Sequence, residues 1–114
     1  MCGVDISALS ERDYNEKLVH ALHHPLSDIR LRAIIALGLQ GDDGAARALV
    51  ECALRHASDV VEGLEVVNSL RQIRSATIRR QALKELTERH PTHGVQMSAK
   101  DACRDRGENP SQDD

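Results

Sequence analysis

The segment from Ile29 to Leu39 has hardly any polar face. One helical stripe holds Ile29, Ala33, Ala36 and Leu37, and a second stripe holds Leu31, Ile35 and Leu39. An isolated surface helix buries only one apolar stripe, so it would leave the other in water. The segment therefore predicts an internal helix with neighbours on two sides. We expect the first stripe to pack on a helix at about 11–23 and the second on helices at about 43–56 and 59–73.

Helix start and stop signals recur at regular intervals along the chain. His24-Pro25 and His90-Pro91 each end a helix, because a residue before proline is pushed out of the helical region. Gly41 favours a left-handed exit conformation. The expected side-chain caps are Ser10, Ser27 or Asp28, Asp42 or Asp43, Asp59 with Glu62 as a capping box, and Ser75. The predicted helices span about 11–23, 27–40, 43–56, 59–73 and 75–90, with a weakly apolar, frayed sixth helix from Thr92.

The helical pattern itself repeats. The stretch "LVHALHHPLSD" (18–28) resembles "LVECALRHASD" (49–59) once one turn residue is dropped. A step of 33 residues carries Leu37 to Leu70, and the same step carries Ala33 to Val66. A period near thirty residues built from helix pairs is typical of an α-solenoid. The expected fold is all-α, a short α-solenoid of about three antiparallel helix pairs.

The chain is long enough for one domain with one core, at 114 residues. The expected boundaries are an N-terminal extension at 1–10, a HEAT-like repeat domain at 11–106 and an acidic disordered tail at 107–114. Leu9, Tyr14 and Leu18 are expected to leave an apolar patch near the N-terminus. Residues 1–9 either fold over this patch as a lid or leave it free for self-association or partner docking.

One stretch resembles a known repeat family. In "DIRLRAIIALGLQGD" (28–42), the arrangement of Asp28, Ala33, Leu37-Gly38 and Gly41-Asp42 resembles the second helix and exit turn of HEAT-like repeats of the short bacterial type, which also occur in phycobilisome lyases. The second repeat departs from this pattern at Leu70-Arg71. The resemblance implies a curved right-handed stack of antiparallel helix pairs that serves as a protein-binding scaffold. It implies no catalytic residue.

Composition narrows the function classes. Tyr14 is the one aromatic residue, which argues against proteins that stack bases on exposed rings. No run of about eighteen apolar residues occurs, and the three cysteines form no Cys-x-x-Cys pair. No nucleophile elbow or phosphate-binding loop is present. We therefore expect a cytoplasmic, non-catalytic protein with reduced thiols and without membrane association, cofactor or bound metal.

The second helix of each pair is expected to supply a protein-binding surface. Arg30 and Arg32 would face a polar strip that contains Glu62 and Glu65. Because the 33-residue step relates Arg32 to Glu65, we expect these side chains to be neighbours with a coupling of about 0.2–1 kcal/mol. The candidate partner-binding residues are Arg30, Arg32, Glu62, Glu65, Arg79 and Arg80. The main interpretation is a protein-interaction module or adaptor that is a monomer or weak homodimer.

Two alternative functions use other features. A local excess of arginine and lysine at 71–90 favours nucleic-acid binding, although the formal net charge of −3 argues against it. All six histidines lie near the turns inside the helix pairs, where they suit helix C-termini. His20, His23 and His24 are close enough in sequence for a small metal-binding accessory protein to use them as ligands.

Overall fold

A computed structural model describes residues 11–104, with side chains from Asp13 onward. Within this range the chain is all-helical. The helices are α1 (Glu11–Ala21), α2 (Ser27–Gln40), α3 (Ala45–Arg55), α4 (Val60–Leu70), α5 (Ala76–Arg89) and α6 (His93–Arg104). The all-α prediction is thus confirmed for this range. The predicted extension at 1–10, with the predicted Ser10 cap and lid, and the predicted tail at 107–114 lie outside the described residues.

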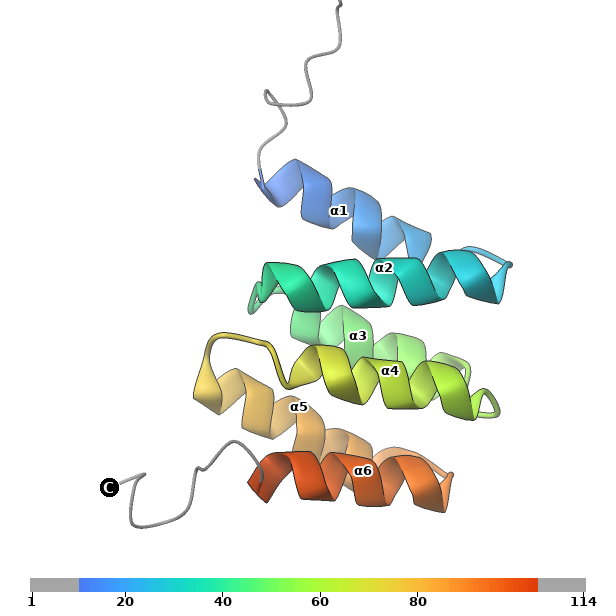
Figure 1. Cartoon of the computed structure of the whole chain (residues 1–114), viewed down its shortest axis with the longest axis vertical. Coiled ribbons are helices and arrows are strands. Elements are labelled where there is room, and N and C mark those ends of the chain that lie inside the picture. Colours follow the sequence, from blue (N-terminus) through green and yellow to red (C-terminus); the bar gives the residue numbers. More distant parts are fainter. Residues whose placement is uncertain (1–10, 105–114) are drawn as a thin grey trace, which may run out of the picture.

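The six helices form two contacting layers (Figure 1). One layer holds α1, α3 and α5, and the other holds α2, α4 and α6, with each helix packing on its nearest neighbour in its own layer. Sequential helices also pack on each other across the layers, as α1 on α2, α3 on α4 and α5 on α6. The core lies between the layers and is built from leucine, isoleucine, valine and alanine side chains. None of the described helices is both long and apolar enough to cross a lipid bilayer.

The prediction that both apolar stripes of α2 are buried is wrong for the second stripe. This helix buries Arg30, Ala33, Ile34, Leu37 and Gly38, a strip that shares Ala33 and Leu37 with the first expected stripe and no residue with the second. Ile35 is 46% exposed and Leu39 is 73% exposed, so the second stripe faces solvent instead of α3 and α4. Periodicity cannot fix the rotation of a helix whose apolar residues extend around most of its circumference.

Gly38 explains the rotation of α2. A Cβ atom at Gly38 would lie 2.8 Å from the Cα of Ser69, so the glycine lets α2 and α4 cross with their backbones nearly touching. The Ser69 hydroxyl donates a 2.6 Å hydrogen bond to the carbonyl of Ile34 across this crossing. Together these contacts turn the Gly38 face of α2 towards α4. They leave Ile35 and Leu39 outside.

Most helix boundaries agree with the predicted signals to within a few residues. Gly41 has a φ of 65° and ends α2 in the left-handed conformation. Asp59 accepts a 3.0 Å hydrogen bond from the Glu62 amide, and Ser75 accepts one of 3.2 Å from the amide of Ile78. The expected capping positions of α4 and α5 are therefore confirmed.

The side-chain caps predicted for α2 and α3 are wrong. The N-cap of α2 is Leu26 and that of α3 is Gly44, and neither makes a side-chain capping bond. The Asp42 carboxylate instead accepts a 2.7 Å hydrogen bond from the Asn15 amide group, and Asp43 accepts one of 2.9 Å from the Ser75 backbone amide. Asp42 also accepts a 3.3 Å hydrogen bond from the amide of Gly44, the N-cap residue of α3, so its carboxylate contributes to the start of α3 as well as contacting α1.

Helix α6 is continuous over twelve residues and not frayed as predicted. Val95, Ala99 and Ala102 are buried in contacts with α4 and α5. The weak apolar pattern reflects small residues that suit close helix packing. Tertiary contacts stabilise this helix more than its own propensity does.

Candidate functional site

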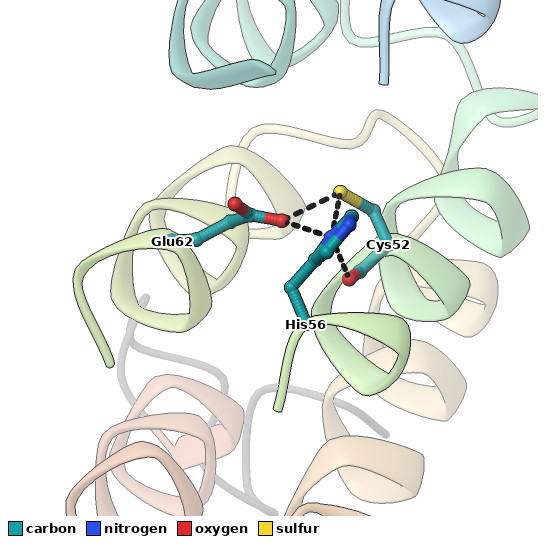
Figure 2. Close-up of side chains that lie close together, drawn as sticks. All are labelled: Cys52, His56 and Glu62. Carbon is teal, nitrogen blue, oxygen red and sulfur yellow. Dashed lines mark hydrogen bonds and ion pairs between the residues drawn. The ribbon is translucent and has the colours of Figure 1, made fainter. Parts of the chain in front are cut away.

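Three chemically versatile side chains meet between α3 and α4: Cys52, His56 and Glu62 (Figure 2). Cys52 and His56 are four residues apart at the end of α3, which places them on one face of that helix. Glu62 comes from the first turn of α4 and points back towards them. Cys52 and Glu62 are fully buried, while the His56 side chain is 24% exposed at the edge of the cluster.

One carboxylate oxygen is the centre of the cluster. The Cys52 thiol donates to Glu62 Oε2 across 3.0 Å, and His56 Nδ1 lies 2.7 Å from the same oxygen. The Sγ and Nδ1 atoms are 3.8 Å apart. His56 Nδ1 also lies 3.1 Å from the Cys52 carbonyl oxygen. Sulfur, nitrogen and oxygen donors therefore converge within 4.8 Å of one another.

Arg30 compensates the buried charge of Glu62. Its Nε donates a 2.9 Å hydrogen bond to Oε1, the carboxylate oxygen that the cluster does not use. Its NH1 group donates to the carbonyl oxygens of His24 at 2.8 Å and Pro25 at 3.1 Å. The guanidinium is thus held by α4 and by the turn between α1 and α2. A buried ion pair of this kind requires such additional hydrogen bonds to offset desolvation.

The electrostatics of the cluster keep the thiol protonated at neutral pH. Burial, together with the hydrogen bond to the Glu62 carboxylate and its negative charge, raises the pKa of Cys52 to about 12. The positive charges of Arg55 and Arg30 oppose part of this effect. A buried thiol beside a carboxylate is therefore a poor thiolate nucleophile.

This arrangement differs from a nucleophile, base and orienting acid in series. In such a triad the base accepts the proton of the nucleophile and the acid holds the other ring nitrogen. Here the thiol donates to Glu62, and His56 contacts the same carboxylate through Nδ1. A thiol, an imidazole and a carboxylate whose donor atoms lie within 4.8 Å of one another are instead a set of ligand types that can hold a metal ion.

The sequence predicts that Glu62 completes a capping box with Asp59, and this half of the prediction is wrong. Glu62 stands three residues after Asp59, and in a capping box its side chain would accept from the Asp59 amide. That amide instead donates to the His56 carbonyl oxygen at 2.9 Å. The Glu62 side chain is therefore free to turn inward to Cys52. The sequence signal that could have identified this cluster is the Cys-x-x-x-His spacing of Cys52 and His56, followed six residues later by Glu62.

The six candidate partner-binding residues divide into two groups. Arg30, Glu62 and Arg79 are buried, and Arg79 donates a 2.9 Å hydrogen bond to the carbonyl of Ile73. These three are unavailable to a partner in this structure. Arg32 and Arg80 are exposed, and Glu65 is half-buried.

Arg30 and Glu62 form the ion pair between the first and second helix pairs. No ion pair or hydrogen bond joins Arg32 to Glu65 in the described part of the chain, and the weak coupling expected between them stays a prediction. The observed ion pair lies two residues before Arg32 on α2 and three residues before Glu65 on α4. The attraction between the buried charges is stronger than it would be in water, and the hydrogen bonds from Arg30 to the His24 and Pro25 carbonyls help to offset their desolvation.

The structure supports the two alternative functions, metal binding by the histidines and nucleic-acid binding by the basic region at 71–90, less than the sequence does. His20, His23 and His24 do not converge as metal ligands; over residues 11–104 the one convergent set is Cys52, His56 and Glu62. Within the basic region, Arg89 pairs with Glu85. The burial of Arg79 removes another positive charge from the surface of that region.

Exposed apolar side chains extend over the layer of α2, α4 and α6. Leu31, Leu64 and Met97 follow one another in steps of 33 residues, one on each of these helices. Leu64 is 37% exposed, Met97 is 42% exposed and Leu31 is half-buried. We define the apolar row as these three residues with Ile35, Leu39 and Val61, which are also exposed. An open hollow of about 500 Å³ beside it is lined by Ile35, Glu65, Asn68, Arg71 and Gln72.

Comparison of the chain with protein-family models, curated proteins and solved structures finds no match.

Proposed function

We propose that the chain is a short α-solenoid of HEAT-like repeats that binds another protein through the apolar row. The repeat interpretation is supported by the regular contacts between alternate helices, α1 with α3 with α5 and α2 with α4 with α6. It is also supported by Ala33, Val66 and Ala99, which are 33 residues apart and all buried. Equivalent positions thus pack in equivalent ways in three successive helix pairs.

The exposed apolar row is the observation that carries the binding proposal. Single exposed apolar residues are ordinary, but here they recur at a 33-residue step on three helices of one layer, α2, α4 and α6. Leu64 and Met97 occupy equivalent positions, and Ile35 lies one turn from Leu31. Exposed apolar patches with polar surroundings mark protein-binding surfaces.

The charges beside the row indicate the chemistry of the partner. Arg32 and Lys100 are positive and Glu65 and Asp101 are negative, so neither sign dominates. A polyanion such as nucleic acid requires an excess of positive charge and gains nothing from exposed leucines. An amphipathic helix with an apolar stripe fits this surface better, because its apolar side chains would cover Ile35 and Leu64.

The test is a paired comparison of surface variants. The face variant combines Ile35→Glu with Leu64→Glu, and the control combines Thr77→Glu with Gln81→Glu, two exposed positions on α5. Proteins captured by the wild type are purified, and their affinities for the wild type, the face variant and the control are measured by calorimetry. We expect the face variant to bind at least about tenfold more weakly than the control.

The same comparison can contradict the proposal. Equal affinity of the face variant and the control for every captured protein would exclude the apolar row as the binding surface. Binding to duplex DNA that falls steeply with salt, and that is insensitive to both glutamate substitutions in the face variant, would favour the nucleic-acid alternative.

A further inference from the structure

We propose that Cys52, His56 and Glu62 form a binding site for one zinc ion or a chemically similar divalent metal. The three residues supply one thiol, one imidazole and one carboxylate, each with a donor atom directed at the same point (Figure 2). This set matches the ligand types of zinc, which binds cysteine sulfur, histidine nitrogen and carboxylate oxygen. The site is independent of the protein-binding surface proposed above.

The spacing of the donor atoms is close to that of a tetrahedral ion. Zinc-ligand distances of about 2.0–2.3 Å place neighbouring ligand atoms roughly 3.4–3.6 Å apart. Here the Sγ–Nδ1 distance is 3.8 Å, the Sγ–Oε2 distance 3.0 Å and the Nδ1–Oε2 distance 2.7 Å. The Sγ–Oε2 contact is a hydrogen bond and the Nδ1–Oε2 contact is an ion-pair contact, so both are shorter than the distance between two ligands of one metal ion. Shifts of about half an ångström accommodate the ion.

Binding exchanges protons for the metal. The Cys52 thiol releases its proton to solvent and coordinates as a thiolate, and His56 coordinates through Nδ1 as a neutral imidazole with its proton on Nε2. Glu62 coordinates through Oε2. These three protein ligands leave a fourth tetrahedral position for water, on the partly exposed His56 side of the cluster.

Arg30 acts as a positioning residue for Glu62. Its hydrogen bond to Oε1 fixes the carboxylate so that Oε2 points at Cys52 and His56. Metal-bound carboxylates are commonly held in this way by an outer hydrogen-bond donor. The guanidinium has its own anchors in the carbonyls of His24 and Pro25, so it does not compete for Oε2.

The donor set also selects among metals. A thiolate disfavours magnesium and calcium, which take oxygen ligands. A mixture of sulfur, nitrogen and oxygen favours zinc or cobalt(II) among divalent ions. Cobalt(II) is a useful probe because its bond to a thiolate gives a charge-transfer absorption band in the near ultraviolet.

The first experiment reports the thiolate-metal bond directly. The full chain, without an affinity tag, carries Cys2→Ala and Cys103→Ala so that Cys52 is the sole thiol. The reduced protein is freed of metal with a chelator and titrated with cobalt(II), then with zinc. We expect a charge-transfer band that saturates at one cobalt per folded chain and disappears as zinc displaces it. A folded chain without this band would overturn the proposal.

The second experiment assigns the ligands. In the same background, His56→Gln and Glu62→Gln are each compared with a control carrying His20→Gln, His23→Gln and His24→Gln. Circular dichroism establishes that each variant is folded. Zinc affinity, measured by competition with a chromophoric chelator, should fall at least about tenfold in the two ligand variants and stay unchanged in the control. Loss of binding in the histidine control with retention in His56→Gln would place the metal on the histidines at the end of α1 and in the turn that follows it, and would overturn the proposal.

Discussion

Cys52 and Glu62 are joined by a 3.0 Å hydrogen bond in which the buried thiol donates to the buried carboxylate. The same carboxylate accepts from Arg30, so one side chain of α4 connects to both α3 and α2. Glu62 is thus a structural junction as well as a candidate metal ligand. Its environment leads to the first prediction.

Replacing Glu62 by alanine should destabilise the fold strongly. The substitution leaves the Arg30 guanidinium buried without its charge partner, and such a loss costs about 3–5 kcal/mol. The double variant Arg30→Met with Glu62→Leu removes both charges and should lose less stability than Glu62→Ala alone. Urea unfolding followed by circular dichroism measures both. A double variant less stable than the single one would show that the ion pair itself is strongly stabilising.

Gly38 should not tolerate even an alanine. A Cβ there would meet the Cα of Ser69 at 2.8 Å, and backbone atoms can yield only if α2 and α4 separate. We expect Gly38→Ala to lower the free energy of unfolding by about 1–3 kcal/mol. Gly94→Ala is the control, because nothing lies within 4 Å of a Cβ at that helical position. It should be neutral or stabilise α6 by roughly 0.5–1 kcal/mol. Equal melting temperatures of the two variants would contradict the close crossing.

His90 should make the protein less stable in mild acid. Burial lowers its pKa below the ordinary value of 6.5, although the Ala53 backbone opposes part of the effect. Below that ordinary value the unfolded chain binds a proton more readily than the folded chain, so stability falls as the pH drops towards the folded pKa. Protonation of Nδ1 would also break the hydrogen bond that it accepts from the Thr92 amide.

The test of this pH dependence uses His90→Asn, whose side-chain oxygen can accept from the same amide without titrating. Unfolding free energies are measured by urea denaturation between about pH 7.5 and 5.5. The wild type should lose more stability over this interval than the variant. Parallel profiles would show that His90 does not contribute to the pH dependence.

The two cysteines in the described range should differ in reactivity. Burial and the neighbouring carboxylate raise the pKa of Cys52 to about 12 and that side chain is fully buried, whereas Cys103 is half-buried and Arg80 opposes the rise of its pKa. Because the thiolate is the reactive form, Cys103 should be modified faster in the native, metal-free protein. A disulfide reagent applied to Cys2→Ala protein, followed by peptide mass spectrometry, measures both rates. The rates should become similar in denaturant, and faster labelling of native Cys52 would contradict the burial.

The helices themselves were largely determined by the sequence. Gly41 ends α2 and Ser75 caps α5 because these signals act within a few residues, and no distant contact competes with them. The buried positions Ala33 and Val66 also followed from the 33-residue step. Each of these features depends on local backbone chemistry or on a periodic pattern that can be read along the chain.

The tertiary structure decided the rotation of α2 and the destination of Glu62. Two apolar stripes of α2 competed for burial, and the close crossing at Gly38 and Ser69 buried a strip that includes Ala33 and Leu37 of the first stripe and leaves out the second. The sequence predicts a local capping role for the Glu62 side chain, which would accept a hydrogen bond from the Asp59 amide. In the structure that amide donates to the His56 carbonyl, and the Glu62 carboxylate accepts from the charged Arg30 guanidinium instead. The sequence contained every residue of the Cys52, His56 and Glu62 cluster. Only the packing of α3 on α4 brought their donor atoms together, because that choice depends on which helix faces meet.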